Sequence, residues 1–233
     1  MRFSTLCLLL IIGLILPTSV DAQRTKKKKK LPLFGASVFA GVNTSQLDGD
    51  EYTGFNKSGA YAGIRGVTRF TNRLQLNIEL IYSQAGALFE HSNRPFAGPV
   101  KRDRLIKLDY AVAPILFRVY VDDEKDGTGV NIEVGAAYAR LVNREVEEII
   151  YDERTDRSYA EIQDDFNTSE WNFITGLGYD FNHKMGVNLR YTLGATRIYV
   201  NEDYMPRTNF SPREEDIELL RSYYISVMGM YHF

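Results

Sequence analysis

Residues 73–83 read Arg-Leu-Gln-Leu-Asn-Ile-Glu-Leu-Ile-Tyr-Ser, and apolar and polar side chains alternate along almost the whole stretch. The even-numbered residues from Leu74 to Tyr82 are apolar, and the odd-numbered residues are polar except for Ile81. Successive side chains of a β-strand point to opposite faces of the sheet. A period of two therefore predicts a strand with one apolar face and one polar face.

The same period recurs along the chain, and no long stretch after Leu31 repeats at helical spacing. The other candidate strands are residues 35–44, 59–70, 105–121, 130–141, 171–181, 185–195 and 222–233. Most are near or above the ~10 residues that a tilted strand needs to cross a bilayer. The pattern predicts an all-β fold: an eight-stranded antiparallel up-and-down transmembrane β-barrel.

The composition of the two faces indicates which one meets lipid. Charged residues gather on the polar face, which we expect to line the lumen as a structural network: Arg65, Arg69, Glu79, Lys107, Asp109, Glu133, Asp180 and Arg190. Aromatic residues stand near the ends of the apolar face, namely Phe70, Tyr120, Trp171, Tyr179, Phe181 and Phe233. Aromatic rings at both ends of an apolar band are typical of a membrane girdle.

The connections alternate between short and long. Short ones are expected at residues 71–73, 122–128 and 182–184, and long ones at about 45–57, 87–104, 142–169 and 200–217. Outer-membrane barrels have short periplasmic turns and longer extracellular loops. The alternation therefore places both ends of the barrel domain on the periplasmic side of a Gram-negative outer membrane.

The N-terminal region is predicted to be a signal peptide, residues 1–22. Arg2 supplies the positive start, residues 6–16 the apolar core, and Val20-Asp21-Ala22 the small-x-small cleavage pattern. A spanning anchor is the alternative, but the apolar run is shorter than the ~20 residues a helix needs. Residues 23–33 would be a basic periplasmic tail, and residues 34–233 the barrel domain. The one cysteine, Cys7, lies inside the signal.

No pattern of catalytic, metal-binding or cofactor-binding residues stands out. The three histidines, His91, His183 and His232, fall on a predicted loop, a predicted turn and the last strand, where they do not easily meet. The chain has no Gly-x-Ser-x-Gly turn, paired-histidine motif or phosphate loop. A formal net charge of −2 leaves no general basic field for nucleic acid. We expect a non-enzymatic protein without a cofactor.

Several short segments, in order, resemble the PorT-like outer-membrane β-barrel family of Bacteroidota-type bacteria, which are OmpA-like small barrels. They are residues 41–50 (GVNTSQLDGD), 54–57 (GFNK), 79–86 (ELIYSQAG), 108–118 (LDYAVAPILFR), 135–141 (GAAYARL), 176–179 (GLGY) and 231–233 (YHF). The resemblance implies an outer-membrane barrel and a link to protein secretion of the type IX kind. This chain has Asn172 where the family has an acidic residue. Pro114 fits the family, and because proline removes a ladder donor we predict a bulge there.

Ile225, Val227, Tyr231 and Phe233 resemble the C-terminal signal that outer-membrane assembly machinery reads. Inside a barrel this narrow, the predicted lumen charges would pair and plug the interior. The expected function is thus a structural or interaction barrel that acts through its outer loops. Its expected partners are outer-membrane lipid, lipopolysaccharide, the assembly machinery and an envelope or secretion complex. The alternatives are a small pore and a soluble lipocalin-like ligand-binding barrel.

Overall fold

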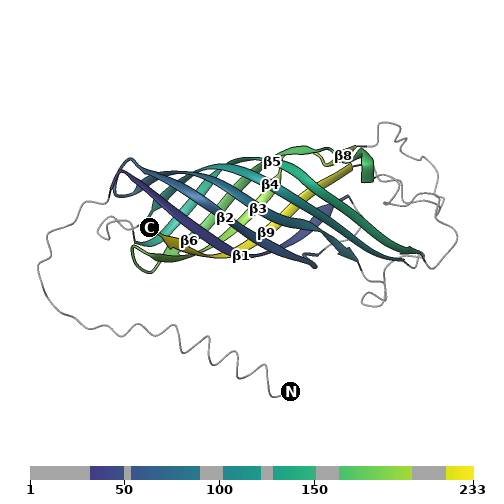
Figure 1. Ribbon diagram of the computed structural model, residues 1–233, viewed down its shortest axis with the longest axis horizontal. Helices are drawn as coiled ribbons and strands as arrows, with labels where there is room; N and C mark the ends of the chain where they lie inside the picture. The colour runs from purple at the N-terminus through teal and green to yellow at the C-terminus, as the bar shows by residue number, and fades with distance from the viewer. Residues whose placement is uncertain (1–31, 50–53, 90–101, 122–127, 151–162, 201–218) are drawn as a thin grey trace, which may run out of the picture. The chain divides into compact units, whose positions relative to one another are not determined.

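The computed structural model describes residues 32–49, 54–89, 102–121, 128–150, 163–200 and 219–233. Eight long strands dominate these residues (Figure 1). They are β1 (Phe34–Asp48), β2 (Lys57–Arg69), β3 (Leu74–Phe89), β4 (Arg102–Tyr120), β5 (Gly129–Ile150), β6 (Ser169–Asp180), β7 (Met185–Gly194) and β9 (Leu219–His232). The predicted signal peptide, residues 1–22, and residues 23–31 of the predicted tail lie outside the described residues.

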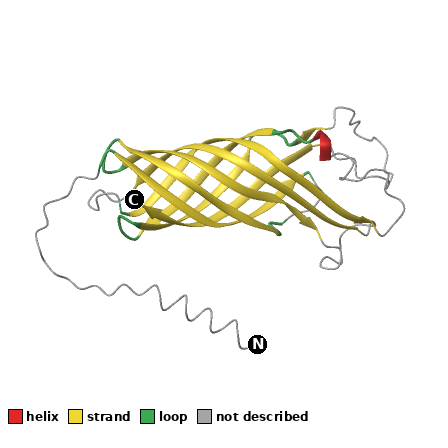
Figure 2. Ribbon diagram, viewed as in Figure 1, coloured by secondary structure: helices red, strands yellow, loops and turns green. Residues whose placement is uncertain are grey.

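The eight long strands close into a ring. Each is antiparallel to its neighbour in the order β1-β2-β3-β4-β5-β6-β7-β9, and β9 pairs back with β1 from Ser37↔His232 to Asp48↔Arg221. Closure removes the open edges that a sheet would otherwise present. Figure 2 shows the tilted strands wrapping around one axis. The predicted eight-stranded antiparallel up-and-down barrel is confirmed.

The two faces of the barrel differ as the period of two requires. On β6 the outward Trp171 and Phe173 expose 56% and 60% of their surface, whereas the inward Glu170 and Asn172 are buried. Phe70, Tyr179, Phe181 and Phe233 of the expected girdle also face outward. Tyr120 does not: it is 3% exposed and lies in the lumen, because it shares the inward phase of β4.

β3 and β5 extend well beyond their expected ends, and β4 begins three residues earlier than expected. The ladder between β4 and β5 runs to Arg102↔Ile150, into residues that the sequence assigned to long connections. Hydrophobic alternation marks only the lipid-facing part of a strand. Backbone ladders can continue into water, where charged side chains are solvated, so the pattern underestimated these strands.

A bulge interrupts β5 beside Asp109 of β4. Asp109 pairs with Asn143 and Tyr110 pairs with Leu141, so Val142 is the extra residue. Because a bulge shifts the side-chain phase, the inward positions of β5 change from odd to even numbers beyond it. Glu145 and Glu147 consequently point outward.

The bulge predicted at Pro114 is wrong. Pro114 pairs with Ala137 in the register that holds from Tyr110↔Leu141 to Tyr120↔Asn131. Toward β3 the pairs Ile78↔Ile115 and Ile81↔Val112 also share one register. The strand therefore passes the proline without an inserted residue, and the missing donor does not displace it.

Two turns at the end that holds both barrel termini are closed by side-chain oxygens. Thr71 Oγ1 accepts hydrogen bonds from the backbone of Arg73 and Leu74, at 3.1 and 2.9 Å. Asn182 Oδ1 accepts from Lys184 and Met185, at 2.8 and 3.0 Å. Such local bonds allow four-residue connections between long strands. We call this end the turn end and the opposite one the loop end.

An apolar cluster lies at the loop end, where η2 (Gln163–Asp165) and the short strand β8 (Tyr199–Val200) are found. Phe166, Ile198, Tyr199 and Leu220 are buried in it, and the backbone of Ile198 bonds both Asn167 and Leu220 at 2.7 Å. These contacts hold the stretches before β6 and after β7 against β9. Among the described residues no helix is long and apolar enough to cross a membrane.

Candidate functional site

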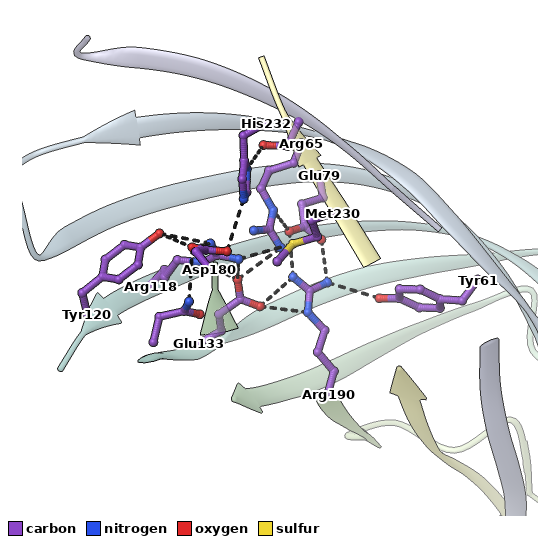
Figure 3. Close-up of polar contacts among 12 residues, drawn as sticks. Tyr61, Arg65, Glu79, Arg118, Tyr120, Glu133, Asp180, Arg190, Met230 and His232 are labelled. Carbon is purple, nitrogen blue, oxygen red and sulfur yellow. Dashed lines mark hydrogen bonds and ion pairs between the residues drawn. The ribbon is translucent and has the colours of Figure 1, made fainter. Parts of the chain in front are cut away.

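A layer of buried charged side chains lies inside the barrel toward the turn end (Figure 3). Each comes from an inward position of a different strand, and together they define the ionic layer: Arg65 (β2), Glu79 (β3), Arg118 (β4), Glu133 (β5), Asp180 (β6) and Arg190 (β7). Inward positions on neighbouring strands meet because a ring of eight strands leaves room only for side chains.

Glu133 lies at the centre of the ionic layer. Its Oε1 is 2.6 Å from Arg118 Nη2 and 3.1 Å from Arg65 Nη2, and its Oε2 is 2.7 Å from Arg190 Nη2. Neither its side chain nor that of Arg190 is exposed. One carboxylate thus contacts three guanidinium groups, which without it would repel one another.

Glu79 forms the second centre. Arg190 donates to both of its oxygens, at 2.7 and 2.8 Å, in the bidentate geometry that suits a guanidinium and a carboxylate. Arg65 Nε donates to Oε1 at 2.6 Å. The Phe39 ring lies 5.7 and 5.8 Å from the guanidinium carbons of Arg65 and Arg190 and covers both cations from β1.

Asp180 connects the ionic layer to the last strand. It accepts hydrogen bonds from Tyr120 and, at 3.0 Å, from Arg118 Nη1. His232 Nε2 lies 3.2 Å from its Oδ1, and His232 Nδ1 lies 2.7 Å from Ser37 Oγ. These distances suit a histidine that donates to Asp180 and accepts from Ser37. The histidine therefore links β6, β9 and β1.

The ionic layer balances its charge, with three guanidinium groups against three carboxylates. Burying ions is costly, and a buried set is tolerated when every member is paired and hydrogen-bonded. Removing one partner of such a set typically costs about 3–5 kcal/mol because it leaves an uncompensated buried charge. A rearrangement that separates these pairs would therefore be costly.

Five of the eight predicted lumen residues belong to the ionic layer: Arg65, Glu79, Glu133, Asp180 and Arg190. Arg69 shares the inward phase but lies half-buried at the turn end, where its Nη1 donates to the Pro32 carbonyl at 3.0 Å. Placing Lys107 and Asp109 in the lumen was wrong. Along β4 they fall on the same outward-facing side as Ile115 and Phe117. Lys107 Nζ donates a hydrogen bond to Glu147 at 2.6 Å on the outer surface.

Arg118, Tyr120 and His232 were missed by the sequence reasoning. The signal for Arg118 was present, since Ile115, Phe117 and Val119 form an apolar outward series and Arg118 falls between them. Reading one phase along the whole of β4 would have placed Arg118 inside. The approach of His232 to Asp180 spans 52 residues of sequence and had no comparable signal.

A further carboxylate, Glu170, lies inside the barrel toward the loop end. It is 3% exposed and accepts hydrogen bonds from Ser222 Oγ at 3.1 Å and Asn172 Nδ2 at 3.3 Å. Asn172 occupies the position where the resemblance led us to expect an acid. Glu170 is the preceding inward residue of β6, so a carboxylate lies one inward step nearer the loop end.

Solved structures of small outer-membrane proteins are similar to this chain at low identity. Ail, the attachment invasion locus protein of Yersinia pestis, is 12% identical over 85% of this chain and 99% of its own, with a TM-score of 0.43. CarO of Acinetobacter baumannii is 12% identical over 86% and 99%, with a TM-score of 0.43. Neisserial surface protein A is 14% identical over 85% and 97%, with a TM-score of 0.41.

A search of curated proteins found no match. A family model described as an outer membrane protein beta-barrel domain matches residues 22–199, which is most of the chain. The closed ring and the outward apolar face described above are those of such a domain. The chain therefore belongs to the outer membrane protein beta-barrel domain family and is an outer-membrane β-barrel protein.

Proposed function

We propose that this protein is a non-enzymatic barrel with a plugged lumen, whose working surface is its loop end. The ionic layer is the observation that carries the proposal. Its ion pairs run between side chains from β2 to β7, and no side chain of Arg65, Glu79, Glu133 or Arg190 has exposed area. An ion entering the lumen would have to separate these pairs and bear the cost of the freed charges.

Membership of an outer-membrane family argues against the soluble lipocalin-like alternative. The orientation of the faces supports the same conclusion, because a lipocalin-like barrel encloses an apolar cavity. Here Ile78, Ile115 and Leu177 are more than half exposed on the outside, whereas arginine and glutamate side chains are buried in the interior toward the turn end. The small pore remains as the competing function.

The loop end supplies a braced surface for a protein partner. Beyond the Val142 bulge, the β4–β5 hairpin, whose strands are connected at the turn end, continues toward its open end at Arg102↔Ile150. Its outer face there joins Lys107 Nζ to Glu145 at 3.1 Å. Within the hairpin Arg104 Nη2 lies 3.1 Å from Glu148, and both side chains are 2% exposed. Cross-strand ion pairs help to hold a hairpin in one register.

The resemblance to PorT-like barrels supports a finer proposal: this protein assists an envelope complex, with protein secretion as the suggested task. Fold alone does not establish function, so the resemblance carries this step. Export would use the N-terminal signal, cleaved after Ala22, and assembly would use Ile225, Val227, Tyr231 and Phe233. Val227, Tyr231 and Phe233 are outward and exposed, so the machinery and the membrane can both meet them.

Planar-bilayer recording tests the plugged lumen. We expect no stable unitary currents from the full-length protein at neutral pH. Glu79→Ala/Glu133→Ala should admit current because it removes two carboxylates and leaves three arginines that repel one another. Lys107→Gln, on the outer face, is the matched control and should stay silent. Stable single-channel currents from the unchanged protein would favour the pore instead.

Site-specific photo-crosslinking in native envelopes tests the working surface. A photoreactive residue at Glu147, on the outward face of the hairpin, should give a defined protein adduct. The same residue at Lys184, exposed at the turn end, is the control and should not give that adduct. An adduct pattern shared by both positions, or none at Glu147, would contradict a protein partner at the hairpin.

A further inference from the structure

Three arginines on the outer surface of the barrel at the loop end have no polar side-chain partner among the described residues. They are Arg140 on β5, Arg197 between β7 and β8, and Arg221 on β9; the first two are exposed and the third is half-buried. Five other arginines of the described residues enter ion pairs, namely the three of the ionic layer, Arg104 and Arg144, and Arg69 donates to a backbone carbonyl. The three arginines, which we call the arginine arc, stand out by contrast.

Backbone contacts bring the members of the arc together. Arg140 pairs with Ser169, two residues before Trp171. The Trp171 backbone N–H donates to Thr196 Oγ1 at 3.0 Å, and Arg197 is the next residue. The Ile198 N–H donates to the Leu220 carbonyl at 2.7 Å, so Arg197 and Arg221 flank this contact. The arc therefore extends from β5 across the end of β7 to β9.

Aromatic rings lie next to the arc on the side toward the turn end. Tyr138 is the outward residue before Arg140 on β5, and Tyr223 is the outward residue after Arg221 on β9. Both therefore lie one outward position nearer the turn end. The Tyr138 and Trp171 rings are 5.4 Å apart in an edge-to-face arrangement. Such rings gather at the boundary between the hydrocarbon and the headgroups. The rings therefore place the arc at the height of the headgroups. With the short turns in the periplasm, as the sequence predicts, this is the extracellular leaflet.

The local charge favours an anion. Asp48 is the cross-strand neighbour of Arg221, but it accepts a hydrogen bond from Tyr223 at 3.2 Å and forms no ion pair within the described residues. The Nε atom of Arg221 is shielded from solvent and has no hydrogen-bond partner there. An unsatisfied guanidinium donor on the same outer surface as two more arginines suits a ligand with several acceptor oxygens.

We propose that the arginine arc binds the phosphate group of a phosphorylated glycolipid in the outer leaflet. Guanidinium groups match phosphate oxygens with paired N–H donors, and they bind them more specifically than lysine does. The acyl chains of such a lipid would lie along the apolar face below, beside Phe173 and Leu189, which are exposed. The site is on the outer surface, so it is independent of whether the lumen is plugged.

The only tryptophan of the chain, Trp171, provides the probe. The full-length protein in detergent micelles is titrated with diphosphoryl lipid A while Trp171 emission is followed. We expect a saturable change in emission that the same lipid without phosphates does not give. Arg140→Gln/Arg197→Gln should weaken the binding on the order of tenfold, since each arginine near an anionic surface contributes to the attraction.

The matched control is Arg73→Gln/Lys184→Gln, which removes two exposed cations at the turn end and should leave the binding unchanged. Retention of the heat-modifiable band verifies that each variant is folded. Equal binding of the dephosphorylated lipid, or equal weakening in both double variants, would overturn the site. Comparable saturation by inorganic phosphate would show that a free anion, rather than a lipid, is the ligand, and would overturn the proposal as well.

Discussion

Glu133 shows how much of the interior depends on one side chain. Its two oxygens contact Arg65, Arg118 and Arg190, which come from three different strands. Such a residue has a double role, because it accepts hydrogen bonds from Arg118 and Arg190 and also screens three like charges from one another. Its neighbours cannot replace it, since Glu79 and Asp180 already have their own arginine partners.

At the residue scale we expect Glu133→Gln to lower the free energy of unfolding by about 3–5 kcal/mol. The amide keeps the shape and loses the charge, so two carboxylates would face three guanidinium groups. Reversible urea titration in lipid vesicles measures the change. Glu147→Gln, an exposed partner of Lys107, is the control and should change stability by less than about 1 kcal/mol. Similar losses in both variants would show that the ionic layer contributes no more than a surface pair.

At the element scale, β4 keeps one alternation of inward and outward residues along its whole length, and it shows the consequence of misassigning them. Its inward series runs without a break from Arg104 to Tyr120, so Lys107 and Asp109 had to face outward. β5 changes phase at Val142, and nothing in its sequence distinguishes that residue as the bulge. At the loop end the positions of β4 and β5 therefore depend on their backbone pairing with each other as well as on the burial of apolar side chains.

Arginine substitution on β3 tests the assigned phase of an element. Ile78 pairs with Gly66 and Ile115 in mid-barrel and is 56% exposed, so it faces lipid. Ile78→Arg should cost about 2–4 kcal/mol in vesicles because the charge lies near the bilayer midplane. Val142→Arg, outward near the loop end, should cost only about 0–1 kcal/mol. Equal unfolding free energies for the two variants would mean that the apolar face has been misplaced.

At the scale of the whole molecule, the class of fold was predictable because each strand carries its own period of two and the connections alternate in length. Five members of the ionic layer were also predictable, since they fall opposite lipid-facing residues. The pairing among them was not predictable. Arg190 and Glu79 are 111 residues apart, and only ring closure brings them within 2.7 Å. The arginine arc was not predictable either. It forms where β7 ends earlier than its neighbours and the residues that follow it contact β9.

The contacts of His232 join the closure of the barrel to its polar interior. His232 lies on β9, which pairs with β1 to close the ring, and it contacts Ser37 of β1 and Asp180 of β6 at the same time. Without β9 the first strand would have an open edge, and the ionic layer would lose its histidine link. One strand therefore seals the backbone ladder and connects the buried side chains across the seam.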